Sequence, residues 1–295
     1  MFKAIQLLGV FSKKNIKQFF SYVTEFFNEW NNHQCTLQAA AIAFYSAFSL
    51  APSLVLIVAV ASFFYGAEAA QGQLIGQARE IIGSDAAASL QAMIANAWRT
   101  KMGTGATIMS LFGIMVGASA TFASLNAALN RIWPSPSNST WSNIAALVRV
   151  RLMSFGLVIG SGFLIVVLLL LDATLNIIGN WPTQEKTTSL FLVNSIQKVF
   201  SFSLSAAVFS TLLKLLPDAP LNWRSAFIGG TMAALLFSIG KNLFSIYLSQ
   251  AGTANTFGAA GSLAVILMWL YFSACVFLAG AELAAMHAKR QFVKL

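Results

Sequence analysis

Long stretches without a single charged residue constrain this chain more than any other feature. No charge occurs in residues 38–67, 102–130, 152–171 or 242–281. A helix needs about 20 predominantly apolar residues to cross a bilayer. Only 9% of the residues are charged and 57% are hydrophobic, whereas an ordinary soluble domain is about 25% charged. The sequence therefore predicts a protein embedded in a membrane.

The lengths of the apolar runs also indicate how many helices to expect. Two further segments qualify as spans when one internal lysine is accepted in each. Barrel strands are excluded because they alternate strictly over about ten residues, whereas these runs are continuous. The sequence predicts an all-α polytopic membrane protein with six transmembrane helices. The expected ranges are 38–65, 103–130, 150–172, 190–216, 225–248 and 258–286.

The net charge of +9 is distributed unevenly over the predicted loops. Twelve of the 18 basic residues fall on one side: Lys3, Lys13, Lys14, Lys17, Arg131, Arg149, Arg151, Lys214, Arg224, Lys289, Arg290 and Lys294. The poorer side has Arg79, Arg99, Lys101 and Lys186. Because basic loops stay in the cytoplasm, both termini are expected to be cytoplasmic. No nucleic-acid partner is expected, because no basic cluster is interleaved with exposed aromatic residues.

Two segments outside the predicted spans have the apolar spacing of helices. Residues 15–30 predict an N-terminal helix that either lies in the cytoplasmic interface, with its aromatic face in lipid, or packs on the bundle. Residues 68–101 carry two apolar stripes separated at 83–85, which predict a periplasmic helical hairpin. We expect one membrane domain over 1–295. It comprises a cytoplasmic tail and interfacial helix (1–37), a six-helix bundle (38–286) and a cytoplasmic tail (287–295).

Residues of catalytic or metal-binding type are few. The chain has only two histidines and two cysteines. Near the predicted cytoplasmic edge are Glu29, His33, Cys35, Glu282 and His287. They lack metal-ligand spacings such as HExxH or CxxC, and the nine acidic residues are scattered rather than clustered as a two-metal nuclease requires. We therefore expect no enzyme activity, no metal and no cofactor, and we interpret both cysteines as structural.

Three segments resemble a known family. Residues 39–59 read AAAIAFYSAFSLAPSLVLIVA, 216–230 read LPDAPLNWRSAFIGG, and 256–283 read TFGAAGSLAVILMWLYFSACVFLAGAEL. They are similar to characteristic segments of the YihY/virulence factor BrkB family of bacterial inner-membrane proteins. The resemblance covers roughly residues 20–290 in the expected order.

The resemblance implies a six-helix inner-membrane protein with both ends in the cytoplasm. It does not imply a reaction, and it supplies no established catalytic residues to carry over. Proteins of this family long carried the name ribonuclease BN, an assignment regarded as mistaken. The link of some members to virulence, and of others to envelope lipid export, suggests a transport role.

Proline and glycine mark places where the predicted helices have special geometry. Pro52 removes a helical hydrogen bond and frees the carbonyl of Phe48, so the first span is expected to kink, either as a structural bend or as a gating hinge. Gly258, Gly261 and Gly280 in the sixth span let backbones approach closely, which predicts helix packing. The alternative is a broken helix whose free amides bind an anion.

Polar residues share one face on several spans. The faces are Ser119, Ala123, Asn126 and Asn130 in the second span, Asn194, Lys198, Ser201 and Ser205 in the fourth, and Thr231, Ser238, Lys241 and Ser245 in the fifth. Convergence of these faces on one cavity favours a transporter or exporter of an anionic amphiphile, lipid or solute. Their use as helix contacts favours a non-transporting scaffold or envelope assembly factor.

Lys198 and Lys241 lie inside predicted spans, where a charge is expensive. Counting the rise per residue from each helix entry puts both in the outer half of the bilayer. Each either extends its side chain to the periplasmic interface or faces the bundle interior, where Asp172 is the nearby acid. Two cations and one anion leave a positive surplus that suits a phosphate or carboxylate. We therefore predict an outward-facing site at these three residues for an anionic amphiphile or solute. Membrane lipids are the other expected partners, and the sequence leaves a homo-oligomer open.

Overall fold

The computed structural model describes residues 13–99, 120–134, 186–219, 221–251 and 259–293. The elements in these residues are α2 (Lys13–Asn32), α3 (Cys35–Tyr65), α4 (Ala67–Arg99), a helix at 120–132, α7 (Lys186–Leu215), α8 (Trp223–Ala251) and α10 (Ala259–Val293). No strand occurs in this part of the chain, so the all-α prediction is confirmed for it. The predicted third span and residues 103–119 of the second lie outside the described residues.

Three of the described helices are long and apolar enough to cross a membrane. They are Lys198–Leu215, Trp223–Leu248 and Gly261–Arg290, which overlap the predicted fourth, fifth and sixth spans. A shorter apolar helical stretch within α3, Cys35–Leu50, overlaps the predicted first span. Pro52 lies inside α3, which continues to Tyr65. The total of six spans and the kink at Pro52 stay predictions.

The N-terminal helix α2 contacts α3 and α10. It meets α3 at Gln34, whose backbone has a positive φ of 53° and whose side chain accepts a hydrogen bond from Arg131 at 2.8 Å. Phe20 and Phe27 remain exposed on α2. Packing against the bundle, one of the two alternatives from the sequence, is therefore observed for part of this helix. The lipid contact of its aromatic residues stays a prediction.

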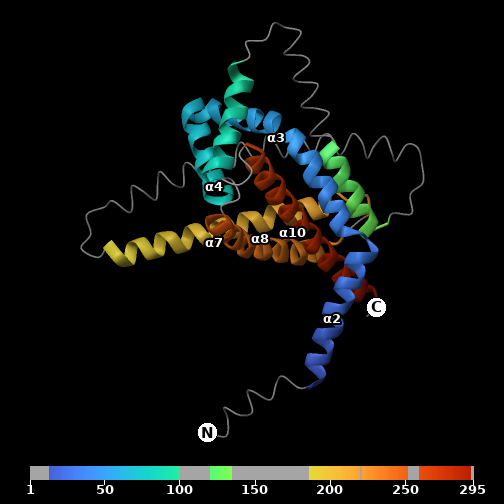
Figure 1. Ribbon diagram of the computed structural model, residues 1–295. Coiled ribbons are helices and arrows are strands. Elements are labelled where there is room, and N and C mark those ends of the chain that lie inside the picture. The colour runs from blue at the N-terminus through green and yellow to red at the C-terminus, as the bar shows by residue number, and fades with distance from the viewer. Residues whose placement is uncertain (1–12, 100–119, 135–185, 220, 252–258, 294–295) are drawn as a thin grey trace.

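Helix α4 has two arms that meet at Gly83, within the predicted break at 83–85 (Figure 1). Gly83 has φ 83° and ψ 171°, a conformation that side chains disfavour, so glycine allows the chain to break here. Apolar residues of both arms pack against α3, α8 and α10. This cluster comprises Val58, Ala70, Ile75, Ile82, Ala86, Ala87, Leu90, Ile94, Phe244, Val265 and Ile266. The two stripes seen in the sequence therefore dock the hairpin onto the helices, and its periplasmic position stays a prediction.

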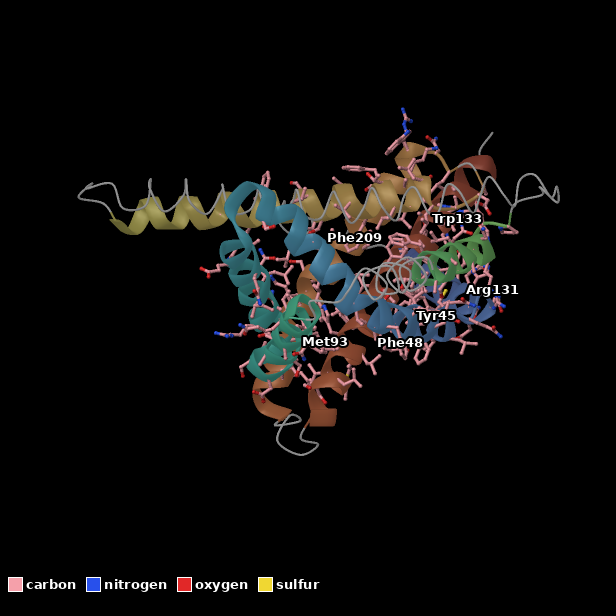
Figure 2. All side chains as sticks on the ribbon, turned by 90° about the horizontal axis from the view of Figure 1, so that it is seen from above. Tyr45, Phe48, Met93, Arg131, Trp133 and Phe209 are labelled. Carbon is pink, nitrogen blue, oxygen red and sulfur yellow. The ribbon has the colours of Figure 1, made fainter. Side chains whose placement is uncertain are left out.

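A second buried cluster joins α3, the helix at 120–132, α7, α8 and α10. Its most buried members include Ala39, Leu129, Leu213, Leu278 and Ala281. Figure 2 shows Arg131 on the helix at 120–132, beside α3, and Trp133 directly after the end of that helix. The two clusters lie toward opposite ends of α10, since one contains Val265 and the other Leu278. The polar sites described below are positioned by these cores.

Small residues bring α7, α8 and α10 into close contact. A Cβ added to Gly229 would lie 2.5 Å from the carbonyl oxygen of Gly280, and one added to Gly230 would lie 2.2 Å from Oγ of Ser210. Such distances leave no room for a side chain, so α8 packs backbone to backbone against its neighbours. Gly261 is also buried in α10, and Gly258 lies outside the described residues.

Candidate functional site

A pocket of about 470 Å³ lies between α7 and α8. Its lining consists of Lys198, Ser201, Phe202 and Ser205 from α7, and Ala234, Phe237, Ser238, Lys241 and Asn242 from α8. We call it the lysine pocket. It contains both lysines that the sequence places inside spans, and three serines from the predicted polar faces of the fourth and fifth spans. Asp172, the third predicted site residue, lies outside the described residues.

The antiparallel packing of α7 and α8 explains why the two lysines meet. The helices touch where Gly230 faces Ser210. Lys241 follows Gly230 along α8 by about three helical turns, and Lys198 precedes Ser210 along α7 by about the same length, roughly 17 Å. Because the helices are antiparallel, both lysines lie on the same side of this contact and at about the same distance from it.

The lysine pocket is rich in hydrogen-bond donors. Lys198 is exposed and Lys241 is half-buried. Neither ammonium has an acceptor or ion-pair partner among the described residues. Ser205 donates its hydroxyl hydrogen to the carbonyl of Ser201 at 2.9 Å, and Phe202 supplies an apolar wall. Such a lining can bind an anionic group and an attached apolar portion together.

The polar face of the second span has a different use. Asn126 donates to the carbonyl of Leu216 at 2.6 Å, just beyond the end of α7. Asn130 donates to the Asp218 carboxylate at 2.6 Å and accepts from the Asp218 backbone N–H at 3.0 Å. These side chains satisfy backbone groups that a helix end leaves without partners. They do not line the lysine pocket, and Ser119 of this face lies outside the described residues.

A second polar site surrounds Glu282 of α10, whose side chain is only 1% exposed. Its Oε1 lies 2.6 Å from Nδ1 of His33 and accepts a hydrogen bond from the Cys35 thiol at 3.3 Å. If Glu282 is ionised it can only accept, and Nδ1 of His33 is then the donor in this pair. Burial, followed by the charge of Glu282, raises the pKa of the Cys35 thiol, so the thiol stays protonated and donates.

Around this buried pair is a more exposed layer of charge. Nε2 of His33 lies 3.7 Å from the Glu29 carboxylate, and Glu29 in turn binds Lys289 at 3.1 Å. Arg290 binds Glu25 at 2.7 Å. These contacts join α2 to the end of α10. We call Glu29, His33, Cys35 and Glu282 the Glu282 cluster.

The sequence placed these four residues near one edge without showing that they meet. The available signal was local, since His33 and Cys35 flank a helix junction and Glu282 directly follows a long charge-free run. Within the described residues, no group of three or more His, Cys, Asp or Glu side chains has an arrangement able to hold a metal ion. His287 is half-buried on α10.

Comparison with known proteins places the chain in a family. The family model described as Virulence factor BrkB matches residues 26–294. The chain belongs to the virulence factor BrkB family. A UPF0761 membrane protein of Rhodospirillum centenum is 30% identical over 87% of this chain and 54% of its own length. One from Pseudoalteromonas atlantica is 24% identical over 89% of this chain and 84% of its own.

A third relative of this BrkB-family chain carries a different kind of name. The putative ribonuclease-like protein YfkH of Bacillus subtilis is 25% identical over 92% of this chain and 96% of its own length. The chain spans 54% and 60% of the relatives from Rhodospirillum centenum and Alcanivorax borkumensis. No solved structure matches the chain. The relatives' names and the long apolar helices identify this family member as a membrane protein.

Proposed function

We propose that this protein transports or exports an anionic amphiphile, lipid or solute across the bacterial inner membrane. The lysine pocket binds the anionic group of that substrate. The observation that carries the proposal is the convergence of Lys198 and Lys241, from two different helices, on one pocket. Charged residues inside membrane segments are rare and generally mark ligand or ion sites.

The lining of the pocket favours an anion with several oxygen acceptors. Two ammonium groups supply charge, while Ser201, Ser238 and Asn242 add neutral donors. Phosphate and carboxylate groups match this set, because both accept charge-assisted hydrogen bonds. The aromatic rings of Phe202 and Phe237 can contact the apolar part of an amphiphile.

Binding to the purified protein in nanodiscs tests this site. The probes are a short-chain phosphatidic acid and inorganic phosphate, which separate a lipid from a free anion. A hydrogen bond to a charged group contributes about 1.5–3 kcal/mol, so Lys198→Met or Lys241→Met should weaken binding roughly tenfold or more. Lys289→Met removes a charge outside the pocket and should leave affinity unchanged. Equal affinity in all three variants, or no binding of either probe, would contradict the proposal.

The second candidate function is a non-transporting scaffold or envelope assembly factor. It is favoured by Asn126 and Asn130, because they make contacts at a helix end and do not line the lysine pocket. Transport of a fluorescently labelled phosphatidic acid across the membrane of reconstituted vesicles separates the two functions. A scaffold leaves the lipid distribution unchanged, and its cellular role survives Lys198→Met and Lys241→Met together.

We also propose that both termini are cytoplasmic and that the α4 hairpin is periplasmic. Ser84 is exposed beside the break at Gly83 and provides a site for labelling. A Ser84→Cys variant in intact cells should react with a membrane-impermeant maleimide. Reaction only after the cytoplasm is opened would reverse the proposed orientation.

No ribonuclease or other enzymatic activity is proposed for this chain, although its Bacillus subtilis relative is named ribonuclease-like. His33 and Glu282 are bound to one another rather than arranged around an open cleft. Purified protein should not degrade RNA. Cleavage that is lost in a His33→Gln or Glu282→Gln variant would prove this proposal wrong.

A further inference from the structure

The buried carboxylate of Glu282 is incompletely satisfied. Both donors to it, His33 and Cys35, bind Oε1, while Oε2 is buried without a hydrogen-bond partner among the described residues. A buried carboxylate needs compensation for the hydration that it loses. The charge of the neighbouring imidazole is therefore a decisive factor in how stable this arrangement is.

A graded series of contacts connects Glu282 with the surface. Side-chain exposure falls from 58% at Lys289 to 26% at Glu29, 18% at His33 and 1% at Glu282. His33 stands at the boundary, with Nδ1 toward the buried carboxylate and Nε2 toward the more exposed one. A histidine in this position can exchange a proton with water on one side while holding an anion on the other.

We propose that His33 and Glu282 form a proton-binding site, reached from the aqueous face past Glu29, and that its occupancy controls the docking of α2 on α10. With the proton bound, the imidazolium and the carboxylate have zero net charge. Nδ1 then donates to Glu282, and Nε2 carries a hydrogen toward Glu29. When the Nε2–H bond breaks and the proton passes to water, the pair carries one negative charge and the attraction to both carboxylates falls.

The surrounding groups support a bound proton. The titratable and charged groups within about two helical turns of the pair along α2, α3 and α10 are Glu25, Glu29, Cys35, Cys275, His287, Lys289 and Arg290, and Arg131 binds the adjacent Gln34. Lys289 and Arg290 are already paired with Glu29 and Glu25. Both cations are also substantially exposed, so solvent screens their repulsion of an imidazolium.

The location of the pair explains how a proton would control α2. His33 directly precedes Gln34, the residue with positive φ at which α2 meets α3. The other ion pairs between α2 and α10 involve exposed lysine and arginine side chains. Exposed pairs stabilise little, whereas the strength of a buried pair depends strongly on charge. Loss of the proton should therefore loosen α2.

A distance measurement on the full chain in nanodiscs tests this proposal. Spin labels are attached through non-canonical amino acids at Ser21 of α2 and Thr211 of α7, both exposed, so that Cys35 is kept. Across about pH 5 to 8, where histidines commonly titrate, the distance distribution of the parent should be narrow at the acidic end and broaden as pH rises. A distribution that does not change in the parent would overturn the proposal without requiring any variant.

Three variants assign the response to the pair. Glu282→Gln and His33→Gln should both abolish the change with pH, because neither can form the charged pair. His287→Gln removes the other histidine of the chain and should keep the change. A response retained in Glu282→Gln and His33→Gln, or lost only in His287→Gln, would overturn the assignment. If either glutamine variant fails to fold, the parent still shows whether the distance depends on pH, and His287→Gln still shows whether His287 is the histidine responsible.

Discussion

The Glu282 cluster and the lysine pocket use polar residues in opposite ways. At the Glu282 cluster, His33 and Cys35 bind the buried carboxylate. Elsewhere, Asn130 binds Asp218 in the segment after α7. In the lysine pocket, neither lysine has a partner among the described residues. Polar side chains in membrane helices therefore cannot be assigned a role by type alone. Those that bind each other hold the helices together, and those left available can bind a ligand.

The close contact of Gly230 with Ser210 separates the lysine pocket from the loop after α7 that Asn126 and Asn130 contact. On one side of this contact, α7 is followed by the loop to which Asn126 and Asn130 donate hydrogen bonds. On the other side, the two helices line the lysine pocket. Substitutions at the contact and at the Glu282 cluster should therefore reduce stability, and substitutions in the pocket should reduce binding.

The largest effect is expected at the contact itself. A Gly230→Leu variant places atoms within 2.5 Å of the Ser210 backbone nitrogen, which cannot move without displacing α7. Overpacking typically destabilises by about 1–3 kcal/mol and occasionally more, and a clash with backbone atoms should fall at or above the upper end of this range. Thermal unfolding in detergent should show the loss. Gly76→Leu is the matched control, because nothing lies within 4 Å of a Cβ at Gly76. Similar melting temperatures for the two variants would show that α7 and α8 do not pack as described.

The next largest effect is expected at the Glu282 cluster. His33→Ala removes the closest partner of a carboxylate that is 1% exposed. Leaving a buried charge without its partner costs about 3–5 kcal/mol, and the partial exposure of His33 should reduce this to about 2–3 kcal/mol. His33→Gln keeps a donor and should lose less. Chemical denaturation at neutral pH measures the difference, and equal stability of the alanine and glutamine variants would remove the argument for this contact.

A smaller loss is expected where the second-span face meets the end of α7. Asn130→Ala removes hydrogen bonds to both the side chain and the backbone of Asp218. Groups that lose a partly buried partner typically cost about 1–2 kcal/mol. Ala127→Asn adds the same amide to an exposed position of the same helix and should change little. No loss in Asn130→Ala would indicate that this polar face is free to serve another site.

The smallest effect on stability is expected in the lysine pocket. Lys198→Met and Lys241→Met remove no described contact with other groups of the chain, so the free energy of unfolding should change by less than about 0.5 kcal/mol. Thermal unfolding without ligand is the measurement. The same variants should lose stabilisation by added phosphatidic acid, because a ligand stabilises only the state that binds it. A large loss of stability without ligand would show that the lysines have a structural role. The lysine pocket would then not differ from the Glu282 cluster in this respect.

The sequence by itself determined the all-α class in the described residues, the membrane character, the family and the break in α4. These properties depend on local information: the length of an apolar run, the spacing of residues on one helix face, and a glycine where the backbone turns. The break at Gly83 was visible for this reason, and so were the faces that carry Lys198 and Lys241.

Only the tertiary structure decided which polar faces meet. His33 and Glu282 are separated by 249 positions, and Asn130 and Asp218 by 88. Helical periodicity states which residues share a face, but the neighbour of that face is set by how whole helices pack. Gly229 and Gly230 permit the backbone contacts that fix this packing. This packing in turn determines which side chains meet several helical turns away. For that reason the second-span asparagines looked like pocket residues in the sequence and became helix-end contacts in the fold, while the two lysines came together.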